Sequence, residues 1–168
     1  MNQPPPTAGP PPPPPPSITE ELDAPLHWLG FEIDCLSPDK VSGHFIITSK
    51  SSQAFKVLHG GVSALIAESL ASIGAHLASG QQRVAGVHLS ISHLKSAQLG
   101  DFIVAEATPV NIGKTIQVWE VRLSKCDDHS NTEIKTLISS SRVTLICNLP
   151  VPESFQTVAQ GLKKYAKL

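Results

Sequence analysis

One long helix, from about Gly60 to Ser79, is predicted by the run His59-Gly60-Gly61-Val62-Ser63-Ala64-Leu65-Ile66-Ala67-Glu68-Ser69-Leu70-Ala71-Ser72-Ile73-Gly74-Ala75-His76-Leu77, and Gly80 ends it. Between Lys56 and Arg83 the one charged side chain is Glu68. Burying a lone carboxylate in an apolar helix costs free energy unless the carboxylate has a hydrogen-bond or ion-pair partner, or a functional role that outweighs the cost. An exposed helix face normally carries several charges, so Glu68 is a candidate functional residue. The alternative is a solvated glutamate on an exposed face.

The helix has two different faces. At 100° per residue, six large apolar residues share an arc about 140° wide, which is the predicted core face: Val62, Leu65, Ile66, Leu70, Ile73 and Leu77. Glu68 points roughly 145° from the centre of that arc, among Ala64, Ala71 and Ala75, with Ser72 one turn on. This second face is small and mostly apolar, which suits close contact with another surface.

Composition excludes several classes of protein. The 168 residues carry a net charge of −1, so neither a nucleic-acid partner nor a membrane-surface partner is expected. No apolar run approaches the ~20 residues of a membrane span, and the first residues lack a signal-peptide core. Three scattered cysteines indicate a reducing compartment. No histidine pair has zinc-ligand spacing with a cysteine partner, so we expect neither a metal nor a cofactor.

Proline marks the first domain boundary. Ten of the 15 prolines lie in the first 16 positions, where they cannot join a helix or a sheet interior. We expect residues 1–22 to form a proline-rich tail, either polyproline II or disordered, with a docking site for a proline-binding module as the alternative. Residues 23–152 form the predicted folded domain, and residues 153–168 a C-terminal segment.

Alternating patterns predict strands on both sides of the helix. A short helical turn at Leu26–Leu29 precedes two strands joined by a turn, and four more strands follow the long helix. The predicted strands are Phe31–Leu36, Val41–Thr48, Val84–Leu94, Phe102–Val110, Thr115–Ser124 and Ile134–Leu149. The order β-β-α-β-β-β-β indicates an α+β fold with an antiparallel sheet curled around one helix.

His59-Gly60-Gly61 stands directly before the helix. Unsatisfied N–H groups of a first helical turn stabilise a developing negative oxygen, so a thioester or another acyl carbonyl could bind there. A tight loop-to-helix turn is the alternative. Gly60 and Glu68 lie ~12 Å apart along the axis, so they cannot both reach one carbonyl from the same helix. If both are catalytic, two antiparallel helices must pair across a C2 interface to give two symmetric sites.

The chain resembles hotdog-fold acyl-CoA thioesterases in the run Gln53-Ala54-Phe55-Lys56-Val57-Leu58-His59-Gly60-Gly61-Val62-Ser63-Ala64-Leu65-Ile66-Ala67-Glu68-Ser69. It is most similar to the aryl-CoA branch, which includes 4-hydroxybenzoyl-CoA and 1,4-dihydroxy-2-naphthoyl-CoA thioesterases. The resemblance continues through Val87–Ala97, Gly113–Glu120 and Ser139–Thr144 and covers most of residues 25–149. It implies the hotdog fold, an antiparallel sheet wrapped around one long central helix.

The resemblance also implies roles for five residues. Glu68 matches the carboxylate that attacks the thioester carbon or activates water to do so. Gly60 matches the backbone N–H that polarises the thioester oxygen, and Gln53 matches an amide that orients thioester and water. Ser72 matches a hydroxyl beside the carboxylate. His59 matches a histidine near the thioester, with a residue that only shapes the loop as the alternative.

For coenzyme A the resemblance implies a second set of residues. His93 and Lys95 form a basic pair after the third strand, and Lys114 and Thr115 follow the Gly113 turn, where the family contacts phosphates. Arg142 is a further candidate. For each, an ordinary solvated side chain is the alternative. Trp119 and His76 are expected in the core, not at the substrate.

The last three residues, Ala166-Lys167-Leu168, fit the small-basic-leucine pattern of a peroxisomal import tail. The chain as a whole is similar to plant peroxisomal thioesterases of phylloquinone (vitamin K1) synthesis. This likeness implies hydrolysis of 1,4-dihydroxy-2-naphthoyl-CoA, a peroxisomal location and recognition by an import receptor. The family implies a homodimer with interface active sites, and a homotetramer of two such dimers.

Three functions remain open at this stage. The first is a thioesterase acting on an aromatic acyl-CoA, or on another aryl- or fatty acyl-CoA. The second is a hotdog relative that binds or dehydrates acyl-CoA without hydrolysing it. The third is a scaffold whose proline tail recruits a partner. Glu68 at the helix position where the thioesterases carry their carboxylate favours hydrolysis.

Overall fold

The structure is a computed structural model, and it describes residues 17–126 and 136–150. Two short helices come first: α1 (Ile18–Leu22) and α2 (Ala24–Trp28). The long helix is α3 (Gly60–Ala78). The strands are β1 (Glu32–Ser37), β2 (Lys40–Ile46), β3 (Arg83–His93), β4 (Phe102–Ile112), β5 (Ile116–Cys126) and β6 (Thr136–Leu149).

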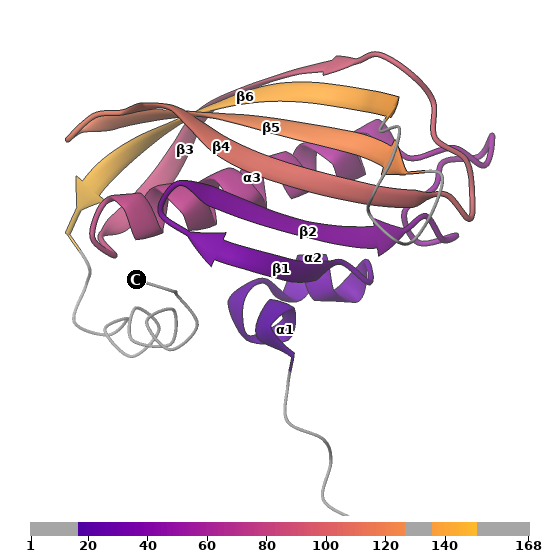
Figure 1. Cartoon of the computed structure of the whole chain (residues 1–168), viewed down its shortest axis with the longest axis horizontal. Helices are drawn as coiled ribbons and strands as arrows, with labels where there is room; N and C mark the ends of the chain where they lie inside the picture. Colours follow the sequence, from indigo (N-terminus) through magenta and orange to yellow (C-terminus); the bar gives the residue numbers. More distant parts are fainter. Residues whose placement is uncertain (1–16, 127–135, 151–168) are drawn as a thin grey trace, which may run out of the picture.

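The six strands form one sheet in the order β1-β2-β4-β5-β6-β3, and every neighbouring pair is antiparallel. Figure 1 shows this sheet curving over α3, which lies against its inner face. The predicted α+β architecture is confirmed. The strand and helix positions agree with the predicted ranges to within two residues at each end.

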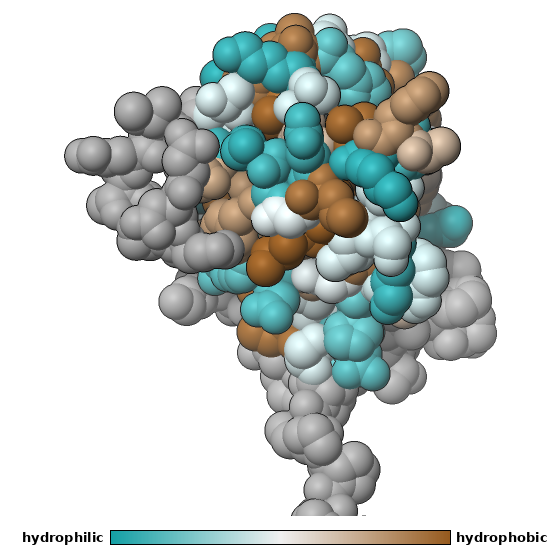
Figure 2. Space-filling view, turned by 90° about the vertical axis from the view of Figure 1, so that its right-hand side faces the viewer, coloured by the Kyte–Doolittle hydropathy of each residue, from teal (hydrophilic) through white to brown (hydrophobic). Residues whose placement is uncertain are grey.

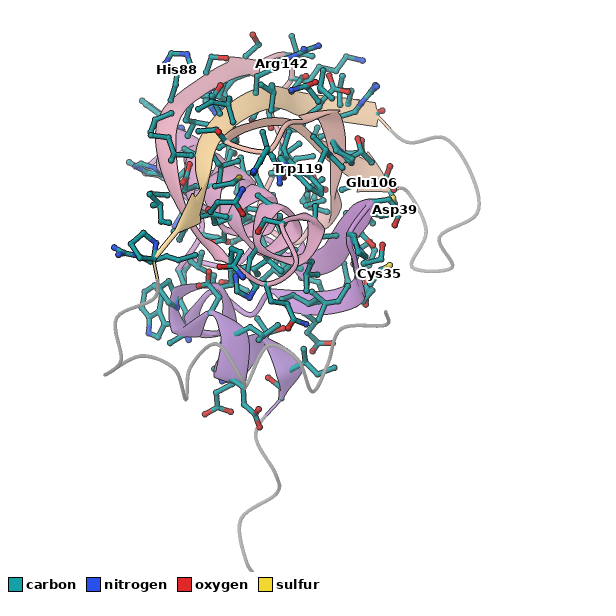
Figure 3. The ribbon with its side chains drawn as sticks, turned by 90° about the vertical axis from the view of Figure 1, so that its left-hand side faces the viewer. Cys35, Asp39, His88, Glu106, Trp119 and Arg142 are labelled. Atoms are coloured by element: carbon teal, nitrogen blue, oxygen red, sulfur yellow. The ribbon has the colours of Figure 1, made fainter. Side chains whose placement is uncertain are left out.

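Small residues let α3 lie close to the sheet. Ala67, Ala71 and Ala75 are fully buried beside Ile66 and Leu70. A Cβ atom added to Gly74 would stand 2.5 Å from Cζ3 of Trp119, so the indole occupies the space that a side chain would need. Trp119 is fully buried on β5, and Figure 3 shows it inside the curve of the sheet. Its predicted place in the core is confirmed.

The predicted division of the helix faces was partly wrong. Val62 and Leu65, assigned to the core face, are only partly buried, whereas Ala71 and Ala75, assigned to the Glu68 face, are fully buried. The curl of the sheet contacts a wider arc of the helix than a flat layer would, which buries the alanines. Val62 and Leu65 instead line a cavity between α2 and α3. The partly or fully exposed residues of α3 are Gly60, Gly61, Val62, Ala64, Leu65, Glu68, Ser72 and Ala78.

The folded part of the chain begins before Asp23. Helix α1 lies inside the segment assigned to the proline-rich tail, and Ser17 caps it by accepting from the Glu20 N–H at 3.1 Å. Thr19 is buried, and its hydroxyl accepts from the Ile33 N–H at 2.9 Å. This contact ties α1 to β1. Residues 1–16 and 151–168 lie outside the described residues.

The expectation that no apolar run approaches the length of a membrane span was wrong, because α3 has the length and mean hydropathy (1.3) of a segment that could cross a membrane. However, 56% of that segment is buried inside the structure, and the sheet supplies its apolar surroundings. The apolarity of α3 is therefore explained by its position in the core of the domain.

Strand β3 lies at one edge of the sheet and pairs only with β6 among the described strands. Its residues are exposed or partly exposed along its whole length. Val87 is 52% exposed, and the register slips between Gly86 and His88, which places a β-bulge there. An unpaired edge strand of this length is a template for pairing with another chain.

His76 near the end of α3 is buried, as predicted. One ring nitrogen, Nδ1, lies 2.8 Å from the Gln82 carbonyl oxygen and donates to it, while Nε2 is buried without a partner among the described residues. Burial lowers the pKa of His76 below its ordinary value, and the Gln82 carbonyl opposes this shift.

This arrangement predicts a pH-dependent stability. The fold disfavours the charged imidazole. The contribution of neutral His76 to the free energy of unfolding is therefore fully present above the unfolded-state pKa of about 6.5, and it is lost as the pH falls toward the folded-state pKa. We expect Tm to fall between pH 7.5 and 5.5 in the wild type. In His76→Asn, which keeps a donor near the Nδ1 position, we expect a flatter profile. If Tm depended on pH equally in the wild type and in His76→Asn, the assignment of this pH dependence to His76 would be contradicted.

Candidate active site

The first turn of α3 leaves one backbone donor free. His59 caps the helix because its Nδ1 accepts from the Gly61 N–H at 2.9 Å. The N–H groups of Val62 and Ser63 lie 2.9 and 3.3 Å from the His59 carbonyl oxygen. Within the described chain, the Gly60 N–H has no hydrogen-bond partner. This donor points out of a helix N-terminus, where the dipole favours negative charge.

Backbone hydrogen bonds fix the loop before α3. The His59 N–H donates to the Ser51 carbonyl at 2.9 Å, and the Leu58 N–H donates to the Ala97 carbonyl at 2.8 Å. Gln53 sits in a turn in which its own side-chain oxygen accepts from the Phe55 N–H at 2.9 Å. Since the oxygen is used inside the loop, the amide nitrogen of Gln53 is left as a donor for a ligand.

His93 lies directly over Gly60. A Cβ atom added to Gly60 would stand 3.1 Å from Cε1 and 3.2 Å from Nε2 of that imidazole. The two residues share a cavity of about 440 Å³ with Gln53, Ser63 and Lys95. The other lining residues are Val57, Leu58, Leu94, Ser96, Ala97 and Ile138. The structure thus brings together two predicted catalytic residues and two predicted coenzyme A ligands.

This cavity opens at the end of the molecule that carries residues 49–58. Figure 2 shows hydrophobic side chains gathered in the middle of that end, with polar side chains around them. Phe55 is 85% exposed, and Leu94 and Leu99 are about half exposed. A mixed surface of this kind suits a ligand with both apolar and polar parts.

A second cavity, also of about 440 Å³, lies on the other side of the His59-Gly60-Gly61 turn. Its walls are mainly apolar and come from α2, α3 and the loop between β2 and α3. Trp28 is 61% exposed there, and the Lys50 ammonium lies 5.2 Å from the centre of its indole ring. The lining residues are Pro25, Trp28, Leu29, Lys50, Ser52, His59, Gly61, Val62 and Leu65. Sequence reasoning placed Trp28 only in a helical turn and missed this cavity.

Glu68 lies two turns beyond Gly60 along α3, outside both cavities. It is partly buried, and one carboxylate oxygen accepts from the Ser72 hydroxyl at 3.4 Å. The predicted pairing of these two side chains is therefore present in the geometry. On the other side the carboxylate lies against Gly86 of β3. A lone glycine in an alternating strand signals close approach of another group, and this signal in the sequence was overlooked.

The remaining predicted residues lie elsewhere. Lys114 and Thr115 form the β4–β5 turn, where their carbonyls accept from Asn148 and from the Cys147 N–H. The start of β5 meets the C-terminal half of α3, since the Gln117 amide lies 3.5 Å from the Ala75 carbonyl. Figure 1 shows the turn far from the start of α3. One protomer thus separates Lys114 and Thr115 from His93 and Lys95.

Arg142 is exposed on β6, and Figure 3 shows it on the outer side of the sheet, away from α3. Its side chain therefore does not line either cavity. No cluster of three or more metal-ligating side chains occurs in residues 17–126 and 136–150.

The chain matches known proteins along most of its length. A model of the thioesterase superfamily matches residues 55–131. The chain is 56% identical over 143 residues to 1,4-dihydroxy-2-naphthoyl-CoA thioesterase 2 of Arabidopsis thaliana, covering 85% of this chain and 91% of that protein. It is 36% identical over 118 residues to 1,4-dihydroxy-2-naphthoyl-CoA hydrolase of Listeria monocytogenes, covering 70% and 89%.

Solved structures show the same fold. A thioesterase from Haemophilus influenzae superposes with a TM-score of 0.63 at 31% identity, covering 78% of this chain and 87% of that one. The resemblance drawn from the sequence is confirmed. The chain belongs to the thioesterase superfamily of hotdog-fold proteins and is an acyl-CoA thioester hydrolase.

Proposed function

We propose that the chain hydrolyses 1,4-dihydroxy-2-naphthoyl-CoA to 1,4-dihydroxy-2-naphthoate and coenzyme A, as in phylloquinone synthesis. The single observation that carries this proposal is the 56% identity to the Arabidopsis thioesterase over 85% of the chain. The relatives from Listeria and Escherichia coli are hydrolases of the same thioester.

The two cavities suit the two halves of this substrate. They lie on opposite sides of the His59-Gly60-Gly61 turn, so a thioester bound at the Gly60 N–H could extend into both. His93 and Lys95 carry cationic or donor groups for the coenzyme A side. On the other side, the exposed Trp28 ring and the apolar side chains of Leu29 and Val62 suit a flat aromatic acyl group.

In the proposed mechanism the thioester oxygen accepts from the Gly60 N–H. Negative charge that develops on this oxygen is stabilised by the donor and by the helix dipole. The Gln53 amide nitrogen orients the thioester or the water. A Glu68 carboxylate, held by Ser72, attacks the carbonyl carbon or activates water, and the thiolate of coenzyme A leaves.

The carboxylate comes from a second copy of the chain in this proposal. Gly60 and Glu68 are ~12 Å apart along α3, and the cavity that contains Gly60 does not contain Glu68. The open edge of β3 and the small, partly exposed face of α3 support a C2 homodimer, in which each helix offers Glu68 to the other helix start. Two such dimers form the tetramer that the family implies.

Substitution of the carboxylate tests the proposed function. We expect Glu68→Gln to lower kcat on naphthoyl-CoA by about 10²- to 10⁴-fold with little change in KM, because the amide neither attacks nor takes a proton. Glu120→Gln on the outer face of the sheet serves as the matched control and should retain full activity. The measurement is thiol release with naphthoyl-, benzoyl- and palmitoyl-CoA. Wild-type turnover in Glu68→Gln would refute the role, and no hydrolysis of any thioester by the wild type would favour a binding protein or a scaffold.

A mixing experiment tests the shared site. Gly60→Pro removes the N–H at the first position of α3, where proline fits, and His59 already has the extended backbone that a following proline needs. Gly60→Ala keeps the N–H and is the control. We expect Gly60→Pro and Glu68→Gln to be nearly inactive alone. After co-refolding in equal amounts they should recover about one quarter of wild-type activity, because half of the dimers contain one intact site. No recovery would mean that both groups act from one chain.

We also infer a peroxisomal location from Ala166-Lys167-Leu168, which lie outside the described residues. At a C-terminus, these residues match the targeting signal that a peroxisomal import receptor binds. A fluorescent protein fused before Met1 should enter peroxisomes with the chain ending at Leu168. It should stay outside them when these three residues are deleted. Equal distribution of the two fusions would contradict the inference.

A further inference from the structure

Gly86 on β3 faces the side chain of Glu68 at a distance that leaves no room for a methyl group. A Cβ atom added to Gly86 would stand 2.8 Å from the Glu68 Cδ and 3.1 Å from Oε2, with Oε1 closer still. The three nearest atoms all belong to the carboxylate. The carboxylate therefore occupies the space that any other residue at position 86 would fill.

Backbone conformation gives no separate reason for glycine at this position. The glycines with positive φ among the described residues are Gly30, Gly80 and Gly100. Gly86 is not among them, so its backbone is one that L-residues adopt readily. Glycine in a strand interior weakens the strand, because it has no side chain to pack and loses more conformational freedom on folding. The close contact with Glu68 gives a reason for glycine at this position despite the loss of strand stability.

The surrounding contacts hold the carboxylate from two sides. Ser72, one turn further along α3, donates its hydroxyl to Oε1 at 3.4 Å. Gly86 closes the opposite side from β3. The β-bulge between Gly86 and His88 adds a residue to β3 at this point, and bulges commonly adjust the aim of neighbouring groups. The Glu68 carboxylate therefore lies between a residue of the helix and the edge strand.

We propose that Gly86 is a positioning residue for the thioester hydrolysis: its missing side chain lets the Glu68 carboxylate lie against β3 in the orientation used by the reaction. This inference rests on the proposed function, in which Glu68 supplies the reacting carboxylate. A methyl group at position 86 would push the carboxylate aside by an ångström or more, and a displacement of that size costs about 100-fold in rate.

The test is Gly86→Ala, measured with naphthoyl-CoA in the full chain. We expect kcat to fall about 100-fold while KM changes less than about threefold, since the carboxylate acts on the reacting bond and not on ground-state binding. Gly43→Ala on β2 is the matched control, because its Cβ would also meet occupied space, the Phe31 ring and the Glu32 carbonyl oxygen, while β2 pairs with β1 and β4 and not with β3. It should lower Tm but leave kcat of the folded enzyme unchanged. Wild-type kcat in Gly86→Ala, or equal kcat losses in both variants, would overturn the inference.

Stability in a Glu68→Ala background provides a readout that does not need activity. With the carboxylate removed, Gly86→Ala should raise Tm or leave it unchanged, because alanine suits a strand better than glycine. In the wild-type background the same substitution should lower Tm. An equal decrease in both backgrounds, or failure of the double variant to fold, would show that glycine serves the strand itself and would overturn the proposal.

The two proposals can fail separately. If Glu68→Gln is inactive and Gly86→Ala is fully active, the proposed function stands and the positioning role falls. If Glu68→Gln is fully active, the catalytic role of Glu68 falls, and the positioning role of Gly86 falls with it whatever the Tm measurements report about the contact.

Discussion

The close approach of α3 to the inner face of the sheet is the packing constraint on which the other features depend. Alanines at positions 67, 71 and 75 are fully buried, and Gly74 leaves its space to the indole of Trp119. Larger residues at these positions would push the helix away from the sheet, because protein interiors have few voids to absorb extra volume. The same short distance brings the partly exposed side of α3 against β3, where Glu68 meets Gly86. Core packing thus sets the position of the candidate carboxylate.

The start of α3 depends on a different set of contacts. Backbone hydrogen bonds hold the last two residues before the helix: His59 donates to Ser51 within the same loop, and Leu58 donates to Ala97 on the β3–β4 connection. That connection also carries Lys95 and follows His93, so tying it to the helix start places both side chains in the cavity of Gly60. The His59 ring satisfies the Gly61 N–H and leaves the Gly60 N–H as the available donor. A few local hydrogen bonds therefore leave one backbone donor available at a helix N-terminus, where the helix dipole favours negative charge.

Much of the fold could be predicted because alternating strands and a long apolar helix have distinct periods. The isolation of Glu68 along the sequence also identified the residue that meets both Ser72 and Gly86. The arc of α3 that is buried could not be predicted, because a helical wheel does not contain the curvature of the sheet. Helix α1 was missed because it directly follows the prolines, and its anchor, the Thr19 contact to Ile33, joins residues far apart in sequence. Lys114 and Thr115 were grouped with His93 although the order of residues does not reveal which end of α3 a turn approaches.

The separation of the candidate groups along α3 has a consequence for assembly. If the donor at Gly60 and the carboxylate at Glu68 act on one thioester, the second helix must run in the opposite direction, because parallel helices would keep like groups beside each other. With a two-fold axis, the Glu68 of each protomer meets the Gly60 of the other across one interface, so two equivalent sites form. A head-to-tail contact would complete one site per interface and leave a free end for further addition. In the C2 arrangement, the turn with Lys114 and Thr115, near the end of one helix, would also approach the start of the other. The residues that one protomer keeps apart would then surround one substrate.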